Sequence, residues 1–178
     1  MEKKNELYYD AMDYLSEGEP GTAKKLLLQA LKIDCEFVDA YVGLVAVYRE
    51  TGNLKQEKES VDAGFDITKR RFPKWPKEME WGILENRPYM RSICDKATTS
   101  QISGDIEMAE ELYRLLLIMN PNDNQGVRYL IAGMFVGLGP EGVDDLMDEC
   151  NEKQNWSKLE KLVDEQNKIH RFWQKMQT

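Results

Sequence analysis

The sequence predicts an all-α protein, a right-handed superhelix of about four helix pairs with one insertion and a closing C-terminal helix. Two observations support this fold. Residues 4–37 and 38–71 align with each other without a gap, and Gly, Pro, Asn or Asp marks each point where a helix pair turns. Repeats of this size bury their apolar stripes only against neighbouring repeats. We therefore expect residues 1–178 to form a single domain.

The first two repeats carry matching residue types at equivalent positions. The matched pairs are Leu7 and Tyr41, Tyr14 and Tyr48, Gly18 and Gly52, Leu31 and Phe65, and Ile33 and Ile67. Gly18 suits a helix end and Pro20 suits the first turn of the next helix. The second repeat departs from the first at Glu57 and Gly64, which stand where the first repeat has alanine. Tight packing of its second helix is therefore left open.

Two further repeats are expected at residues 90–123 and 124–155. In the third, a helix over about 90–103 ends at Gly104, and Asp105 caps the next helix. In the fourth, the turn 137–140 separates a first helix from a second over 141–150. The buried stripe of that first helix is Val127, Leu130, Ile131 and Met134.

Residues 72–89 interrupt the period. Pro73 and Pro76 break the preceding helix, and the pattern predicts a short helix over 78–85. We interpret Trp75 and Trp81 as packing residues of this insertion. The alternative is that the two indoles form a ledge that binds a partner.

The end of the chain, residues 156–177, reads as one long amphipathic helix. Its apolar stripe is Trp156, Leu159, Leu162, Val163, Ile169, Phe172, Trp173 and Met176. A stack of repeats leaves an apolar face at its end, so we expect this helix to act as a cap. The alternative is that it contacts a second copy and makes a homodimer.

Composition narrows the classes of function. Lys plus Arg total 24 and Asp plus Glu total 32, so the net charge is −8, which argues against binding nucleic acid through its phosphates. The basic cluster at 69–77 is interpreted as a cationic helix end, with single-stranded nucleic acid as the alternative ligand. The sequence has no long apolar run and no signal peptide, and its three cysteines lie far apart. We expect a cytoplasmic protein that binds neither membrane nor nucleic acid.

No reaction is predicted. The sequence has no glycine-rich phosphate loop, no paired metal-ligand motif and no nucleophile elbow. A hydrolase dyad of His170 with Cys150 has no motif behind it. We therefore predict no catalytic residue, no metal and no cofactor.

The first repeat resembles the signature of the tetratricopeptide repeat (TPR) family. The matching residues are Leu7, Ala11, Tyr14, Gly18, Ala23, Leu27, Ala30 and Leu31. The resemblance implies a concave groove, lined by the first helix of each repeat, that binds a peptide or partner protein. By repeat position, the groove residues we single out are Tyr8, Tyr9, Met12, Arg49, Arg91, Arg128 and Tyr129, and Asp39 and Asp95 share this face. From its apolar patch and its arginines, we expect a peptide with an apolar patch and an acid.

Some TPR domains hold the terminal carboxylates of a chaperone with Lys, Asn and Arg. The matching positions here are Tyr8, Met12, Gly43, Arg91 and Asp95. Only Arg91 has suitable chemistry, so we do not expect that clamp.

Residues 84–130 also resemble paired motifs of the suppression-of-tumorigenicity family and of uncharacterised prokaryotic TPR-like proteins. The motif residues run over 84–91 and 120–129. They draw attention to Arg87, Arg91 and Arg128, whose guanidiniums would together accept a carboxylate or phosphate. The alternative is that Glu85, Asp95 or Asp123 already pairs with these arginines inside the protein.

The sequence therefore predicts a non-enzymatic adaptor or scaffold that captures a partner polypeptide. The alternative function is a self-assembling structural protein that uses its groove or last helix.

Overall fold

The computed structural model describes residues 2–174, and within them the chain forms nine α-helices and one 3₁₀ helix, with no strand. The prediction of an all-α protein is confirmed. The described chain packs as two compact units that divide one helix, α5 (Arg87–Ile102), between them. Unit 1 holds the described residues up to Trp75 together with Glu85–Asp95. Unit 2 holds Pro76–Leu84 together with the described residues from Lys96 onward.

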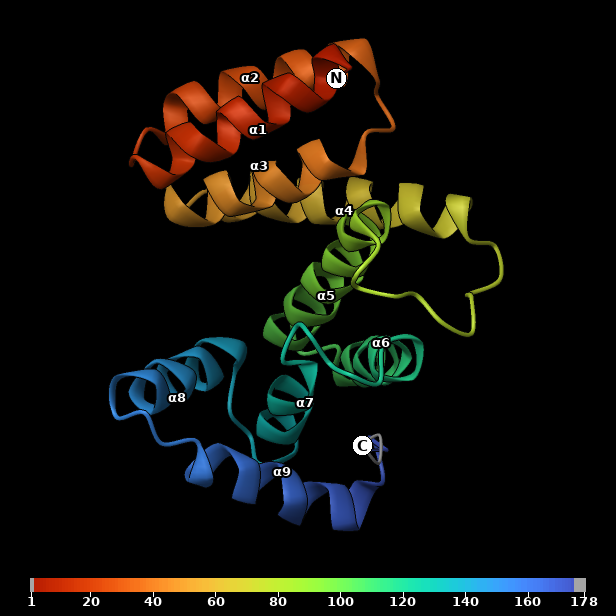
Figure 1. Ribbon diagram of the computed structural model, residues 1–178, viewed down its shortest axis with the longest axis vertical. Helices are drawn as coiled ribbons and strands as arrows, with labels where there is room; N and C mark the ends of the chain where they lie inside the picture. The colour runs from red at the N-terminus through yellow and green to blue at the C-terminus, as the bar shows by residue number, and fades with distance from the viewer. Residues whose placement is uncertain (1, 175–178) are drawn as a thin grey trace. The chain divides into compact units, whose positions relative to one another are not determined.

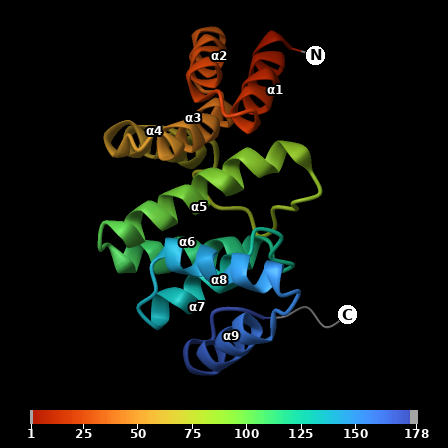
Figure 2. The same cartoon turned by 90° about the vertical axis from the view of Figure 1, so that its left-hand side faces the viewer.

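Unit 1 consists of two helix hairpins and the first half of α5. The first four helices are α1 (Lys3–Ser16), α2 (Pro20–Ile33), α3 (Val38–Glu50) and α4 (Leu54–Arg71). Helix α1 lies along α2, α3 lies along α4, and α2 also packs on α3 (Figures 1 and 2). The 3₁₀ helix Leu84–Asn86 leads into α5. A hydrogen bond of 3.3 Å from the Thr68 hydroxyl of α4 to the Ser92 hydroxyl joins α4 to α5.

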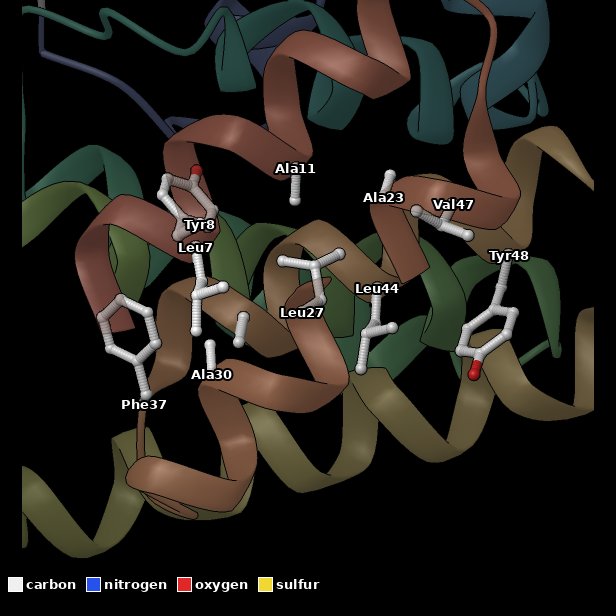
Figure 3. Packing of buried hydrophobic residues seen from close by; sticks show 11 residues of the cluster. Leu7, Tyr8, Ala11, Ala23, Leu27, Ala30, Phe37, Leu44, Val47 and Tyr48 are labelled. Carbon is white, nitrogen blue, oxygen red and sulfur yellow. The ribbon is translucent and has the colours of Figure 1, made fainter. Parts of the chain in front are cut away.

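The core of unit 1 alternates small and large side chains. Ala11, Ala23 and Ala30 are fully buried, and their small size lets α1 and α2 approach closely. Leu7, Leu27 and Leu44 fill the space between the backbones (Figure 3). The alanines and leucines of the repeat pattern are therefore explained by burial.

In the second hairpin, side-chain contacts account for Glu57 and Gly64 at the two positions where the first repeat has alanine. Glu57 is held by Arg49, whose Nε donates to the Glu57 Oε1 over 2.9 Å. At Gly64, a Cβ would lie only 3.2 Å from the Cβ of Tyr41. Tyr41 therefore occupies the room that an alanine methyl would need, and the helix still packs, burying Val61 and Phe65.

Unit 2 is built around α7. Its helices are the second half of α5, α6 (Ile106–Met119), α7 (Val127–Phe135), α8 (Pro140–Glu152) and α9 (Ser157–His170). Helix α7 contacts α6, α8 and α9, which is why Ile131 on it is fully buried. Tyr113 of α6 donates to the Gln101 side chain over 3.0 Å, and Gln101 donates to the Leu138 carbonyl over 2.8 Å.

Each predicted turn between paired helices has the same backbone geometry. Gly18, Gly52, Gly104 and Gly137 all have positive φ. In each turn the next amide donates five residues back, as Glu19 does to Tyr14 over 2.8 Å, and the glycine amide donates three residues back. These bonds satisfy the last carbonyls of the helix, and glycine adopts the required conformation without steric cost. Asn53 and Asp105 cap the following helices, as predicted.

The predicted short helix over 78–85 is wrong. Within residues 78–85, the only helical residues are Leu84 and Glu85, which belong to the 3₁₀ turn Leu84–Asn86. Met79 is buried, and its amide donates to the Met119 carbonyl at the end of α6 over 2.8 Å. The Met79 amide therefore bonds to the last carbonyl of α6, and it is not available for a hydrogen bond within a helix of its own segment.

The predicted helix over 156–177 is also too long. Helix α9 ends at His170, and Arg171 follows with a φ of 50°. The Asn167 side chain donates to the Trp173 carbonyl and accepts from the Trp173 amide at 2.8 and 2.9 Å, which turns the chain back. Ile169, placed in the buried stripe by its spacing, is 68% exposed. Met176 lies outside the described residues.

Candidate functional site

Helix α1 supplies an aromatic and apolar strip in unit 1. Tyr9 is 54% exposed, whereas Tyr8 is buried with its ring 5.4 Å from that of Tyr9 and 6.1 Å from Phe37. Met12 is half-buried and packs against α3 at Gly43. The contact is close, since a Cβ added at Gly43 would lie 3.0 Å from the Met12 methyl. Of the three predicted groove residues on α1, Tyr9 and Met12 therefore offer surface, and Tyr8 belongs to the core.

Asp39 lies in the first turn of α3 and is half-buried. Burial raises the pKa of its carboxyl to about 6, and the charges of Arg91 and Lys4 only partly oppose this effect. Lys4 is already paired with Asp34 at 2.8 Å and with Glu2 at 3.3 Å. The carboxylate accepts a hydrogen bond from its own backbone amide. Sequence reasoning placed Asp39 on this face, but only the burial identifies it as unusual.

Arg91 of α5 lies beside Tyr8 and Asp39. Burial and the Asp39 charge raise the pKa of the Tyr8 hydroxyl, and the nearby Arg91 guanidinium lowers it. Three helices of unit 1 thus meet at Tyr8, Asp39 and Arg91. These neighbours come from α1, α3 and the first half of α5.

Arg49 of α3 is half-exposed and pairs with acidic side chains of unit 1. Besides Glu57, its Nη2 lies 3.6 Å from Asp95 Oδ1 of α5. Burial raises the pKa of Asp95 to about 6, while the Arg49 charge lowers it. Arg49 is therefore a structural tie between α3, α4 and α5.

Within unit 2, the carboxylates of Asp123 and Glu160 neutralise the Arg128 guanidinium. Its Nη1 lies 2.9 Å from Asp123 Oδ2 and its Nη2 lies 3.2 Å from Glu160 Oε1. The Tyr129 hydroxyl accepts from the same guanidinium and donates to Glu160 over 2.5 Å. For Arg128, the internal ion-pair alternative is the one that the structure contains.

The three arginines of the predicted anion site do not belong to one unit. Arg87 and Arg91 belong to unit 1 and Arg128 to unit 2. Tyr129, proposed as a groove residue, is buried under Trp156, with ring centroids 5.7 Å apart. The pairs around Arg128 and the burial of Tyr129 remove both as surface residues, because their polar groups are used within unit 2.

His170 and Cys150 have structural places in unit 2. The His170 ring stacks on Phe135 at 3.7 Å and 7°, and Cys150 is buried in α8. In residues 2–174, no group of three His, Cys, Asp or Glu side chains is placed to hold a metal ion.

The basic cluster surrounds the end of α4. Lys69, Arg70 and Arg71 occupy its last turn, where cations complement the helix dipole. Arg70 also pairs with Glu36 at 3.1 Å. A shallow hollow of about 530 Å³ lies between Asp66, Lys69, Arg70 and Pro73. Trp75 is half-buried near Phe65, with ring centroids 6.4 Å apart.

Across the described part of the chain, no helix combines the length and the apolar character needed to cross a membrane. Comparison of the sequence with protein families and with characterised proteins, and of the structure with solved structures, finds no match.

Proposed function

We propose that this chain is a non-enzymatic binding module of the TPR type. It takes a partner polypeptide on the face formed by α1, α3 and the first half of α5, which we call the unit 1 face. The observation that carries this proposal is the exposed Tyr9 ring, 5.4 Å from the ring of Tyr8, whose hydroxyl feels the half-buried charges of Asp39 and Arg91 from two other helices. Exposed aromatic rings next to partly buried charges are typical of surfaces that bind proteins.

The turn glycines support the repeat assignment. The interval from Gly18 to Gly52 is the length of one repeat, and the interval from Gly104 to Gly137 is shorter by a single position. The longer interval from Gly52 to Gly104 equals one repeat plus the insertion 72–89. We infer a right-handed superhelix of four repeats interrupted once. A cytoplasmic location is part of this proposal, supported by the exposed thiol of Cys35.

The internal contacts of the C-terminal aromatic residues favour the cap over self-association. Phe172 is 4% exposed, and Trp173 Nε1 donates to the Pro121 carbonyl over 2.9 Å. Trp156 packs on Tyr129. Side chains engaged in this way have little surface left for a second copy.

The test uses the full chain and an immobilised library of randomised hexapeptides. We expect wild type to retain peptides with micromolar affinity, and Tyr9→Ala to weaken that affinity about tenfold. Tyr14→Ala is the matched control, because Tyr14 is a half-exposed tyrosine of the same helix, five residues further along. Retention of no peptide by wild type, or equal loss in both variants, would rule out the proposed binding face.

A further inference from the structure

We propose that the unit 1 face binds a cationic side chain of its partner, a lysine or an arginine, at the carboxylate of Asp39, with the aliphatic stem lying against Tyr9 and Met12. This inference rests on the proposed function and specifies the chemistry of the partner.

The first argument is the incomplete neutralisation of Asp39. Among the residues that the structure describes, no cation lies within ion-pair distance of this carboxylate. The charged and titratable groups that face it are Lys4 and Tyr8 of α1 and Arg91 of α5. Lys4 is committed to Asp34 and Glu2, and Arg91 reaches toward Tyr8. A half-buried carboxylate in this state gains from an additional cation.

Asp95 is a comparable carboxylate of unit 1, but the chain itself supplies a cation to it. It lies on the same face and has the same raised pKa of about 6. Arg49 approaches it to 3.6 Å and also binds Glu57. The chain therefore provides a guanidinium for one buried carboxyl of this face and leaves the other for a partner.

The second argument is the apolar surface that α1 supplies near Asp39. Met12 of α1 packs at Gly43, one turn after Asp39 on α3. The Tyr9 ring lies 5.4 Å from the ring of Tyr8, whose hydroxyl feels the Asp39 charge. Lysine and arginine combine an apolar stem with a charged end, so they match a tyrosine ring and a methionine next to a carboxylate. The net charge of −8 adds a long-range attraction for cationic partners.

This chemistry differs from the acidic peptide that the sequence predicts. Asp123 and Glu160 already neutralise Arg128. Arg49 is held by Glu57 and Asp95. An acidic partner would also meet the Asp39 carboxylate, so the observations favour a cationic side chain.

The experiment measures binding of the full chain to four pools of randomised hexapeptides, each with one fixed central residue: lysine, arginine, norleucine or glutamate. We expect the lysine and arginine pools to bind wild type about tenfold more tightly than the norleucine pool, which has the stem without the charge. Asp39→Asn should remove this preference, so that the lysine and arginine pools bind this variant no more tightly than the norleucine pool does. Asp66→Asn, an exposed carboxylate of α4 in the same unit, is the control and should keep the preference.

The dependence on pH gives a second readout. A bound cation requires the ionised carboxylate, so affinity for the lysine pool should fall as pH drops from about 7.5 to about 5, through the pKa of Asp39 near 6. In Asp39→Asn this dependence should disappear. Binding of any pool without a preference for cations, or tightest binding of the glutamate pool, overturns the cation site but leaves the binding face. Failure of wild type to bind every pool overturns the proposed function itself.

Discussion

Asp39, Asp95 and Asp123 are carboxylates held partly or wholly away from water, and their partners differ. Asp95 has Arg49, and Asp123, with a side chain only 1% exposed, has Arg128 and two backbone amides. Asp39 has its own backbone amide and the more distant charges of Arg91 and Lys4. Burial raises the pKa of all three carboxyls. The effect of substituting each aspartate on stability therefore depends on which hydrogen-bond donors and cations would lose their acceptor.

Asp39→Asn is expected to stabilise the chain at neutral pH. The pKa of Asp39 is about 6 in the folded chain and about 3.9 in an unfolded one. The folded state therefore binds the proton more tightly, and its stability falls as pH rises from about 4 to about 7. Asparagine does not titrate, so the free energy of unfolding should rise by about 1–2 kcal/mol at pH 7.5. Near pH 4 the difference should vanish.

Urea unfolding at both pH values measures this effect, with Asp66→Asn as the control. A loss of stability in Asp39→Asn at pH 7.5 would mean that the carboxylate makes an attractive contact inside the fold. The cation site of the unit 1 face would then lose its main support.

Asp123→Ala is expected to destabilise unit 2 by about 3 kcal/mol. The carboxylate accepts from the Val127 and Arg128 amides at 2.7 and 3.0 Å, and it neutralises the Arg128 guanidinium. Its removal leaves two helix-end amides and a charge without this acceptor. Asp123→Asn keeps an amide oxygen and tolerates the φ of 49°, so it should lose about half as much.

Hydrogen exchange of α7 amides, compared in wild type and the two Asp123 variants, measures this loss. Equal losses in the alanine and asparagine variants would show that the charge of Asp123 matters and its capping bonds do not.

At the scale of the helices, close approach depends on glycine at a few positions. Helices α7 and α8 come together at Gly133, where a Cβ would lie 2.3 Å from Val143 Cγ2. Val143 is buried, so its side chain has little room to move. Gly133 sits inside a helix, where alanine would otherwise be preferred. Packing of the two helices therefore decides the residue at this position.

Gly133→Ala is expected to lower the free energy of unfolding by about 2–3 kcal/mol. Val143→Ala in the same chain should restore part of that loss, because it removes the clashing methyl groups. Gly21→Ala is the matched control in the first turn of α2, where a Cβ meets nothing within 4 Å. It should be neutral or stabilising by less than about 1 kcal/mol. Similar Tm values for Gly133→Ala and wild type would show that α8 shifts freely on α7.

At the scale of the whole molecule, the aromatic residues after α9 determine the expected oligomeric state. Phe172 and Trp173 are engaged within unit 2, and Arg114 donates to the carbonyls of His170 and Arg171 at 3.0 and 3.3 Å. We expect light scattering of the full chain to give the monomer mass at micromolar concentration. A dimer that Trp173→Ala dissociates would make self-association the function. A dimer that survives this change would place the interface elsewhere.

Much of the architecture was predictable because local chemistry specifies it. The apolar spacing of α1 to α4 and the glycines at 18, 52, 104 and 137 predict the hairpins and their turns. The two errors, over 78–85 and after His170, arose where backbone groups bond to distant partners. Met79 bonds to Met119, and Arg114 bonds to the end of α9. Periodicity within one segment carries no information about such bonds.

The candidate site divides in the same way. Repeat position alone placed Tyr9, Met12, Asp39 and Arg91 on one face, because the repeat period fixes which helix positions are equivalent. Only the tertiary structure decided that Tyr8 and Tyr129 are buried, that Asp123 and Glu160 neutralise Arg128, and that Asp39 lacks such a partner. Burial and charge pairing depend on residues far apart in the chain. The sequence by itself therefore determined the helices and their turns, and the packing of those helices determined which of their charges remain available to a partner.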